Sequence, residues 1–234
     1  MSLGKYACKR LGSICKYYSN HLYSFHPPQA AHVKEVDARN ADYWRIVSEL
    51  EAQTPPSFLK SSGNIELDGG EHLLSSMDHV IVCGDLNYRL DLPRELAERT
   101  VNCIQKSEGG IEARRLRSSL LRHDQLLRTI SEGRAFADFA EGEIQFPPTF
   151  KFDKGTLDYD TSHKQRIPAW TDRILFRPNG VQVHEYSSVQ DATHSDHRPV
   201  YATLGLSLVG REGIAEPTKR RRRRKESRTE VQVL

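Results

Sequence analysis

The chain has 234 residues, of which 37% are hydrophobic and 28% are charged, so it is long enough to form one domain with a buried core. Seven Lys and Arg residues at 219–225 account for the positive sign of the net charge of +3. Without them, the net charge of the remaining residues is about −4. This distribution argues against a chain that binds nucleic acid over its whole surface. We find no run of 18 apolar residues for a membrane span, and the basic first 20 residues lack the apolar core of a secretory signal.

The cysteines do not have the spacing of a metal site. They are Cys8, Cys15, Cys83 and Cys103. One of them falls inside an apolar run that reads as a buried strand. We therefore expect reduced thiols in an intracellular protein.

The first predicted element is a helix at 29–50, after an N-terminal segment (1–28) that has no clear period. Side chains suited to burial recur there at three- and four-residue steps, which is typical of an amphipathic helix. They are Val33, Val36, Asn40, Tyr43 and Val47. The two prolines at 55–56 are expected to end this helix, and the Gly- and Ser-rich residues 60–78 to form a surface loop.

The stretch HVIVCGDLNYRLDL at 79–92 predicts a buried strand that ends in polar residues. Four apolar residues precede Gly84, whose lack of a side chain permits an unusual backbone conformation. Asp85, Asn87 and Tyr88 follow at the strand end, where functional sites tend to be built. Ordinary turn chemistry is the alternative, since Asp and Asn often bond to nearby backbone after a strand.

Two helices are predicted next, at 91–105 and 111–133. In the first, Pro93 lies in the first turn and Leu96, Val101 and Ile104 share one side, whereas the second is stopped by Gly133. An extended, aromatic and turn-rich stretch follows at 142–170.

Three strands are predicted after residue 170, at 172–176, 181–189 and 199–208. From Arg211 onward the chain is polar and charged and is expected to be disordered. The mixture of β-runs and helices predicts a layered α/β or α+β sandwich.

Two of these later strands also begin at acidic residues. Asp172 and Arg173 open one apolar run, and Asp196 and His197 precede another. If the strands share a sheet, their ends converge on one pocket. That pocket would contain Asp85, Asn87, Asp172, Asp196 and His197. The alternatives are a solvated turn before an edge strand and a surface Asp–Arg pair, which contributes little energy.

This set of side chains suits metal-assisted hydrolysis of a phosphate ester. A carboxylate can position and deprotonate the attacking water. A hard cation such as Mg²⁺ takes oxygen ligands and offsets the charge of the phosphate. A histidine oriented by a second carboxylate can hydrogen-bond a phosphate oxygen.

Positive side chains in the stretch 151–166 predict a substrate with several phosphates. They are Lys151, Lys154, Lys164 and Arg166. A charged loop balanced by Asp153, Asp158 and Asp160 is the alternative interpretation.

Taken together, the motifs resemble the inositol polyphosphate 5-phosphatase family, within the superfamily of Mg²⁺-dependent endonucleases, exonucleases and phosphatases. The matching strings are, in order, AAHVKEVDARNADY, GDLNYR, PTFKFD, YDTSHKQRIPAWTDRIL and SDHRPV. The resemblance runs from about Gln29 to Leu206. It implies a four-layer α/β/β/α sandwich with a catalytic domain at 29–208, an atypical segment at 1–28 and a disordered polybasic tail at 209–234.

The resemblance also implies roles for single residues. Asp85 resembles the base that positions water, Asn87 the amide that orients the phosphate, and His197 the histidine that stabilises the transition state. Asp172 resembles the carboxylate that orients this histidine, and Asp196 would lie beside the metal. The implied substrate-binding residues are Lys151, Lys164, Arg166, Tyr88 and Arg173.

The chain departs from the family pattern in its first half. The N-terminal strands and the glutamate that is a principal Mg²⁺ ligand in the family have no counterpart, so we expect an incomplete sandwich and a truncated or mis-predicted product. SNHL at 19–22 and AAH at 30–32, which are contiguous in the family, are separated here. Whether His21 and His32 carry family roles therefore stays open.

Three functions remain in competition. The first is a Mg²⁺-dependent phosphatase that removes the 5-phosphate from phosphoinositides, such as phosphatidylinositol 4,5-bisphosphate, or from soluble inositol polyphosphates. The second is an inactive fragment of such an enzyme, and the third is a nuclease of the same superfamily. No nucleic-acid partner is expected, because the basic 151–166 stretch and PAWTDR match the phosphatases.

The basic segment 219–225 has two functional readings: contact with an anionic membrane, or a nuclear localisation signal. A solvated end is the alternative. A cytoplasmic protein, peripheral at membranes or nuclear through its tail, is the expected location.

Overall fold

The computed structural model describes residues 33–53, 73–74, 77, 79–107 and 110–207, together with the backbone of two strands at 23–24 and 228–233. Predictions for the rest of 1–28, most of 60–78 and the basic segment 219–225 lie outside these residues, as do Cys8, Cys15, His21 and His32. None of the described helices is both long enough and apolar enough to span a membrane.

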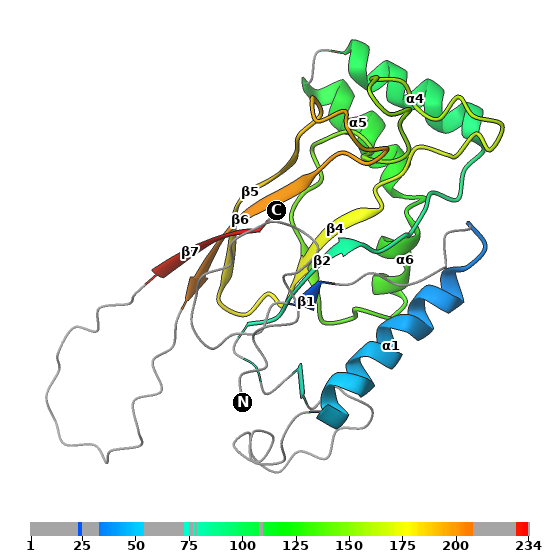
Figure 1. Cartoon of the computed structure of the whole chain (residues 1–234). Coiled ribbons are helices and arrows are strands. Elements are labelled where there is room, and N and C mark those ends of the chain that lie inside the picture. The colour runs from blue at the N-terminus through cyan, green and yellow to red at the C-terminus, as the bar shows by residue number, and fades with distance from the viewer. Residues whose placement is uncertain are drawn as a thin grey trace, which may run out of the picture.

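Two β-sheets form the centre of the molecule (Figure 1). The first has the strand order β1-β2-β4-β3, with β1 (Tyr23–Ser24), β2 (Ile81–Asp85), β3 (Ala140–Glu141) and β4 (Asp172–Phe176). The second consists of β5 (Val181–Ser188), β6 (Val200–Ser207) and β7 (Arg228–Val233). Only the β1–β2 pair is parallel among these strands. The predicted strands at 172–176, 181–189 and 199–208 are thus confirmed to within a residue or two.

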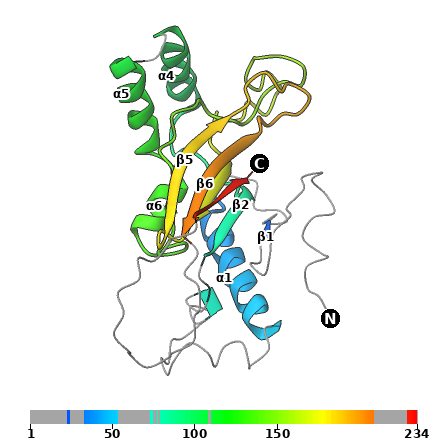
Figure 2. The same cartoon turned by 90° about the vertical axis from the view of Figure 1, so that its left-hand side faces the viewer.

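In the described part of the chain, four helices with defined bounds are arranged around these sheets. They are α1 (Val36–Gln53), α4 (Arg94–Lys106), α5 (Gly110–Leu121) and α6 (Gln125–Ser131). Helix α1 lies along the first sheet, whereas α4 and α5 pack on each other beyond one end of the strands, as the two views at right angles show (Figures 1 and 2).

The alternating pleat of the first sheet divides the apolar side chains into two cores. Val82 belongs to the cluster that contains Tyr43 and Val47 of α1, whereas its neighbour Cys83 belongs to the cluster that contains Leu204 of β6. Successive side chains of a strand point to opposite faces, so one face packs on the helix and the other on the second sheet. This is the α+β sandwich that the sequence predicts, and the described residues supply three of its layers.

One long predicted helix, 111–133, is in fact two helices separated by a short turn. Asp124 breaks it, because its carboxylate accepts the backbone N–H of Leu127 at 2.9 Å and caps α6. Aspartate favours such capping bonds over the helix interior. The same residue forms an isolated backbone bridge with Leu90.

The apolar side of α4 is shifted by one residue from the prediction. Leu96 is 46% exposed, and Ala97 is fully buried in its place beside Val101 and Ile104. Pro93 caps the helix rather than lying in its first turn. The buried stripe therefore follows the steps 97, 101 and 104, which are the spacings of one helix face.

The expectation of disorder from Arg211 onward is wrong for its last residues. Residues 228–233 form β7, which pairs with β6 from Ala202↔Val233 to Ser207↔Arg228. The segment alternates β-branched and polar residues, and β6 offers an edge with free backbone groups. The alternating pattern of 228–233 and the free edge of β6 therefore allow a strand to form here, although the composition of the segment is polar.

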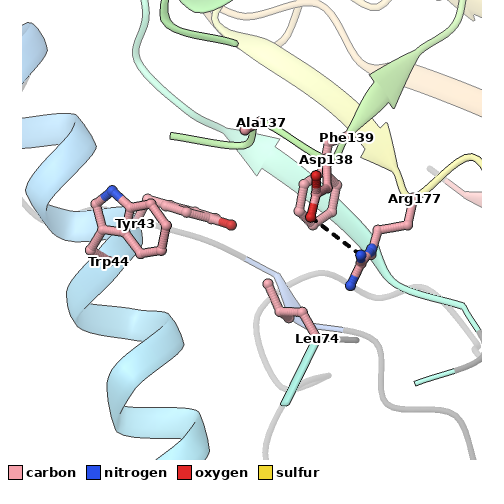
Figure 3. A pocket seen from close by; sticks show the side chains of 7 residues that line it. All are labelled: Tyr43, Trp44, Leu74, Ala137, Asp138, Phe139 and Arg177. Atoms are coloured by element: carbon pink, nitrogen blue, oxygen red, sulfur yellow. Dashed lines mark hydrogen bonds and ion pairs between the residues drawn. The ribbon is translucent and has the colours of Figure 1, made fainter. Parts of the chain in front are cut away.

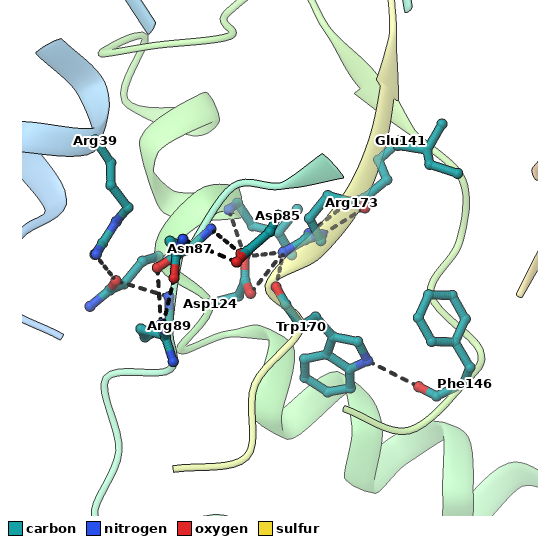
Figure 4. Close-up of polar contacts among 12 residues, drawn as sticks. Arg39, Asp85, Asn87, Arg89, Asp124, Glu141, Phe146, Trp170 and Arg173 are labelled. Atoms are coloured by element: carbon teal, nitrogen blue, oxygen red, sulfur yellow. Dashed lines mark hydrogen bonds and ion pairs between the residues drawn. The ribbon is translucent and has the colours of Figure 1, made fainter. Parts of the chain in front are cut away.

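A buried ion cluster links the first sheet to α6 (Figure 4). The guanidinium of Arg173, whose residue is 1% exposed, binds the Asp124 carboxylate at 3.0 Å and the Glu141 carboxylate at 2.6 Å. Removing one member of a buried ionic cluster leaves the others charged without compensation.

We therefore predict that Arg173→Met lowers the free energy of unfolding by about 3–5 kcal/mol, measured by urea denaturation. The matched control is Arg177→Met, four residues along the same chain segment, whose partner Asp138 is 66% exposed. Its loss should stay below about 1 kcal/mol, as for other surface pairs. Equal losses for the two variants would contradict the assignment of a buried structural cluster.

Candidate functional site

Two carboxylates lie side by side where β2 and β4 pair. Asp85 and Asp172 are direct partners in the antiparallel register. Directly opposed residues in such a pair have their side chains on the same face of the sheet. Gly84, just before Asp85, has a φ of 136°, which glycine adopts without strain. The pairing of the strands thus brings together two acids that are 87 positions apart in sequence.

His197 reaches these acids from the segment that leads into β6. The Arg198 N–H donates to the Thr149 carbonyl at 2.8 Å, and the Phe152 N–H donates to the Asp196 carbonyl at 2.9 Å. These backbone bonds fix the segment against the extended stretch 149–152. The ring nitrogen Nδ1 of His197 then lies 2.7 Å from Oδ2 of Asp172.

The predicted convergence is confirmed for Asp85, Asp172 and His197, but these residues do not share a single sheet. Asp85 and Asp172 belong to the first sheet, whereas His197 precedes β6 of the second. Face-to-face packing of the sheets, rather than pairing within one sheet, brings the histidine to the acids.

The Asp172 carboxylate sets both the tautomer and the charge of His197. A carboxylate only accepts hydrogen bonds, so Nδ1 is the donor and Nε2 is left for another partner. Burial lowers the pKa of His197, but the hydrogen bond to Asp172 and the charges of Asp172, Asp85 and Asp196 outweigh it, and the pKa is raised. The Thr171 hydroxyl donates to the same Asp172 oxygen at 2.9 Å and helps to hold it.

Asp85 is held by the residue that the sequence analysis paired with it. Its Oδ1 accepts the Asn87 backbone N–H at 2.9 Å, and its Oδ2 accepts the Asn87 side-chain amide at 3.1 Å (Figure 4). Burial and the nearby charge of Asp172 raise the pKa of Asp85. A raised pKa makes a carboxylate a stronger base towards water.

The donor set fits a hard divalent cation. Ligand atoms of Asp85, Asp172 and His197 all lie within 4.8 Å of one another. Mg²⁺ typically binds through one or two carboxylates together with substrate phosphate and water. Asp196 is not a member of this group, although its charge acts on His197. Its place beside a metal stays a prediction.

Asp160 organises the basic stretch that follows. Its buried carboxylate accepts the backbone N–H of Ser162 at 3.2 Å and of Arg166 at 2.8 Å, and pairs with the Lys151 ammonium at 3.4 Å. The Lys151 ammonium and the backbone of Arg166 thereby share one carboxylate. Lys164 is exposed on the same loop.

Two residues predicted to bind substrate are placed elsewhere by the fold. Tyr88 is 1% exposed and its hydroxyl donates to the Asn40 side-chain oxygen at 2.7 Å, in the core beneath α1. Arg173 forms the buried ion cluster with Asp124 and Glu141. Since successive side chains of a strand point to opposite faces, Asp172 can face the site while Arg173 faces away from it.

Residues that the sequence analysis missed support the site from below. Arg89 donates to Asn87, and its guanidinium lies 4.2 Å from the centre of the Phe150 ring. The Phe150 ring in turn lies 4.6 Å from that of His197. Both residues fall inside quoted motifs, GDLNYR and PTFKFD, but nothing local in the sequence shows that they touch.

A separate hollow lies between α1 and the end of β4 (Figure 3). It is lined by Tyr43, Trp44, Leu74, Ala137, Asp138, Phe139 and Arg177. Its charged groups are Asp138 and Arg177, which pair at 3.3 Å. It contains none of the acids or the histidine described above, so it is distinct from the candidate site.

The Asp160 network predicts a pH dependence of stability. Burial raises the pKa of Asp160, but hydrogen bonds from Ser162 and Arg166 and the charge of Lys151 lower it to about 2. A depressed pKa stabilises the fold above the unfolded value near 3.9, and this contribution is lost as the pH falls towards 2. We expect Asp160→Asn to cost about 2 kcal/mol at pH 7 and clearly less at pH 3, measured by urea denaturation. Asp153→Asn, on the same loop, serves as the control, and an Asp160→Asn loss that does not change with pH would contradict the account.

Known proteins share this sequence pattern over most of the chain. The model of the endonuclease/exonuclease/phosphatase family 2 matches residues 14–203. The chain is 39% identical over 180 residues to inositol-1,4,5-trisphosphate 5-phosphatase 1 of Schizosaccharomyces pombe, covering 77% of this chain and 14% of that protein. It is 35% identical over 185 residues to type IV inositol polyphosphate 5-phosphatase 11 of Arabidopsis thaliana, covering 77% of this chain and 47% of that protein.

A solved structure agrees with these sequences. The inositol polyphosphate 5-phosphatase domain of SPsynaptojanin, in complex with inositol (1,4)-bisphosphate and calcium ion, matches with a TM-score of 0.54 and 38% identity. The match covers 74% of this chain and 43% of that one, so the chain spans less than half the length of these relatives. With the model matching most of its length and 5-phosphatases as its relatives, the chain belongs to the endonuclease/exonuclease/phosphatase family.

Proposed function

We propose that this chain hydrolyses a phosphate monoester, with water as the nucleophile. The observation that carries the proposal is the joining of Asp85 to the Asp172–His197 pair across two sheets. A hydrogen-bonded carboxylate beside an oriented imidazole supplies a base and a proton donor within one small volume.

Each of these side chains has a part in the proposed step. Asp85 accepts a proton as the water oxygen bonds to phosphorus and the ester P–O bond breaks. The second N–H of the Asn87 amide is available to a phosphoryl oxygen, because the first is used by Asp85. Protonated His197, held by Asp172, donates from Nε2 to the charge that develops on oxygen.

The substrate we propose carries more than one phosphate. It is a phosphoinositide, such as phosphatidylinositol 4,5-bisphosphate, or a soluble inositol polyphosphate that loses its 5-phosphate. The names of the relatives and the bisphosphate in the related structure support this class. Lys151, Lys164 and Arg166 would bind the phosphates that are not cleaved, at the edge of the site.

We propose Mg²⁺ as the cofactor, held beside Asp196 and next to the group formed by Asp85, Asp172 and His197. When bound, a divalent cation supplies positive charge that offsets that of the phosphate. The calcium ion in the related structure supports a divalent cation of this kind.

The test measures phosphate release from phosphatidylinositol 4,5-bisphosphate and from inositol 1,4,5-trisphosphate, with Mg²⁺ and with a chelator. We expect Asp85→Asn and His197→Gln each to lower kcat by at least about 100-fold, as for the loss of a general base or acid. Asp138→Asn and His184→Gln are the matched controls, since both side chains are exposed and lie away from the site.

Three results would contradict the proposal. One is no release from the soluble, folded chain with either substrate. A second is release that Asp85→Asn leaves intact, and the third is cleavage of plasmid DNA without phosphate release. The first result supports the fragment interpretation, and the third supports a nuclease.

The basic segment supports a location at an anionic membrane. We propose that 219–225 contacts the membrane on the cytoplasmic side, with nuclear import as the competing role. Each Lys or Arg near an anionic surface contributes about 1 kcal/mol. The segment is joined at one side to β6 and at the other to β7, so it is a connection between two strands rather than a free end.

The design of the membrane test follows from that connection. Truncation would remove β7, so all seven basic residues are replaced by Gln instead. We expect pelleting with phosphatidylserine vesicles to fall at least about 100-fold in affinity and the native chain to lose binding as salt rises. Undiminished vesicle binding by the substituted chain would contradict the proposal that 219–225 contacts the membrane.

A further inference from the structure

Arg89 is a buried arginine directly beneath the catalytic candidates. It is 4% exposed, and its Nε donates to the Asn87 carbonyl at 3.1 Å while its Nη2 donates to the Asn87 side-chain oxygen at 2.6 Å (Figure 4). It therefore binds both the backbone and the side chain of a single residue. Such a paired contact restrains the position and the rotation of its partner.

These bonds decide which way the Asn87 amide faces. A guanidinium has donors only, so the amide atom that meets it must be the oxygen. The amide nitrogen then faces Asp85, whose Oδ2 accepts from it at 3.1 Å. The backbone of Asn87 is in the left-handed region, with φ of 58°, which is unusual for a residue other than glycine. Arg89 thus adds two hydrogen bonds to an orientation of Asn87 that Asp85 also holds.

The positive charge of Arg89 acts on the carboxylate of Asp85 as well as on the Asn87 amide that it bonds to. None of the ion pairs formed within the described part of the chain includes Arg89. Burial lowers the pKa of Arg89 to about 10, so it remains charged at neutral pH. A hydrogen bond from a charged donor polarises the acceptor group and strengthens the donors on its other side. The Asn87 N–H groups are therefore stronger donors than those of an isolated amide.

A second contact connects Arg89 to the histidine. The guanidinium lies 4.2 Å from the centre of the Phe150 ring, and that ring lies 4.6 Å from the His197 ring at an interplanar angle of 50°. The Phe150 ring therefore contacts both the Arg89 guanidinium and the His197 imidazole. Contacts of this kind are attractive for a desolvated arginine.

We infer that Arg89 is a positioning residue of the site. It orients the Asn87 amide so that one N–H holds Asp85 and the other meets the phosphoryl group, and it supports the His197 ring through Phe150. Arg89 itself does not touch substrate. The effect on rate rests on the proposed hydrolysis, whereas the orientation of the amide can be tested without any activity.

The first test is a double-mutant cycle in the full chain. Arg89→Lys keeps the positive charge but loses the paired hydrogen bonds from Nε and Nη2 to Asn87. We expect kcat to fall about 10- to 100-fold with KM changed less than about 2-fold, as for a misplaced catalytic group. In an Asn87→Ala background the same change should cost less than about 2-fold, because the target of the positioning is gone. Arg177→Lys is the control: this arginine pairs with Asp138, away from the site, and is expected to have equal effects in both backgrounds.

The second test reads the amide directly by nuclear magnetic resonance. The Asn87 side-chain NH₂ signals are assigned by their loss in Asn87→Ala. We expect two well-separated proton shifts with slow exchange in the native chain, and shifts that approach those of exposed amides in Arg89→Lys. Arg177→Lys, at the arginine paired with Asp138 away from the site, should leave the Asn87 signals unchanged.

The outcomes separate this inference from the proposed function. A chain that releases no phosphate defeats the proposed function, and the amide signals then decide the inference alone. Equal losses of kcat in both backgrounds, no loss of kcat, or Asn87 signals that are the same in the native and Arg89→Lys chains would each overturn it. Coupled losses of kcat, or a change of the amide signals confined to Arg89→Lys, would support it.

Discussion

The hydrogen bond between His197 and Asp172 joins the two sheets at the site. At 2.7 Å it is the direct link between the strand-end acids of the first sheet and the segment that enters β6. Both partners lie at ends of strands, so a small shift of one sheet over the other would break it. The packed cores behind each strand oppose such a shift, because close-packed interiors deform little. The integrity of the chemical site therefore depends on sheet-on-sheet packing.

The alternation of side chains along β4 separates chemistry from stability within a few residues. Asp172 faces the site, whereas Arg173 faces α6 and neutralises Asp124 and Glu141. Both residues are charged and partly or wholly buried, and their different partners give them different functions. Beneath the site, Arg89 has a third kind of role, because its bonds go to an amide rather than to an acid. The role of each of these charged residues thus depends on the direction in which its side chain points.

The sequence was sufficient for most of the elements and for the grouping of the candidate site residues. Periodicity and strand-end position predicted β2, β4, β6 and α1, and the motifs predicted Asp85, Asn87, Asp172 and His197. It was not sufficient for Tyr88 and Arg173, because a motif does not say which of two adjacent residues faces the site. Nor could it separate α5 from α6, since the tertiary partners of Asp124 decide that break. β7 was missed because pairing with a distant edge is a non-local effect.

The most direct test is to measure the nitrogen-15 and proton chemical shifts of the His197 ring by nuclear magnetic resonance. The native chain is compared with Asp172→Asn. We predict that Nδ1 carries the proton and that its signal lies far downfield, as in a strong hydrogen bond to a carboxylate. We also predict that this signal moves upfield in Asp172→Asn, while the His184 signal is unchanged. Identical His197 signals in the two chains would contradict the claim that the two sheets meet through this bond.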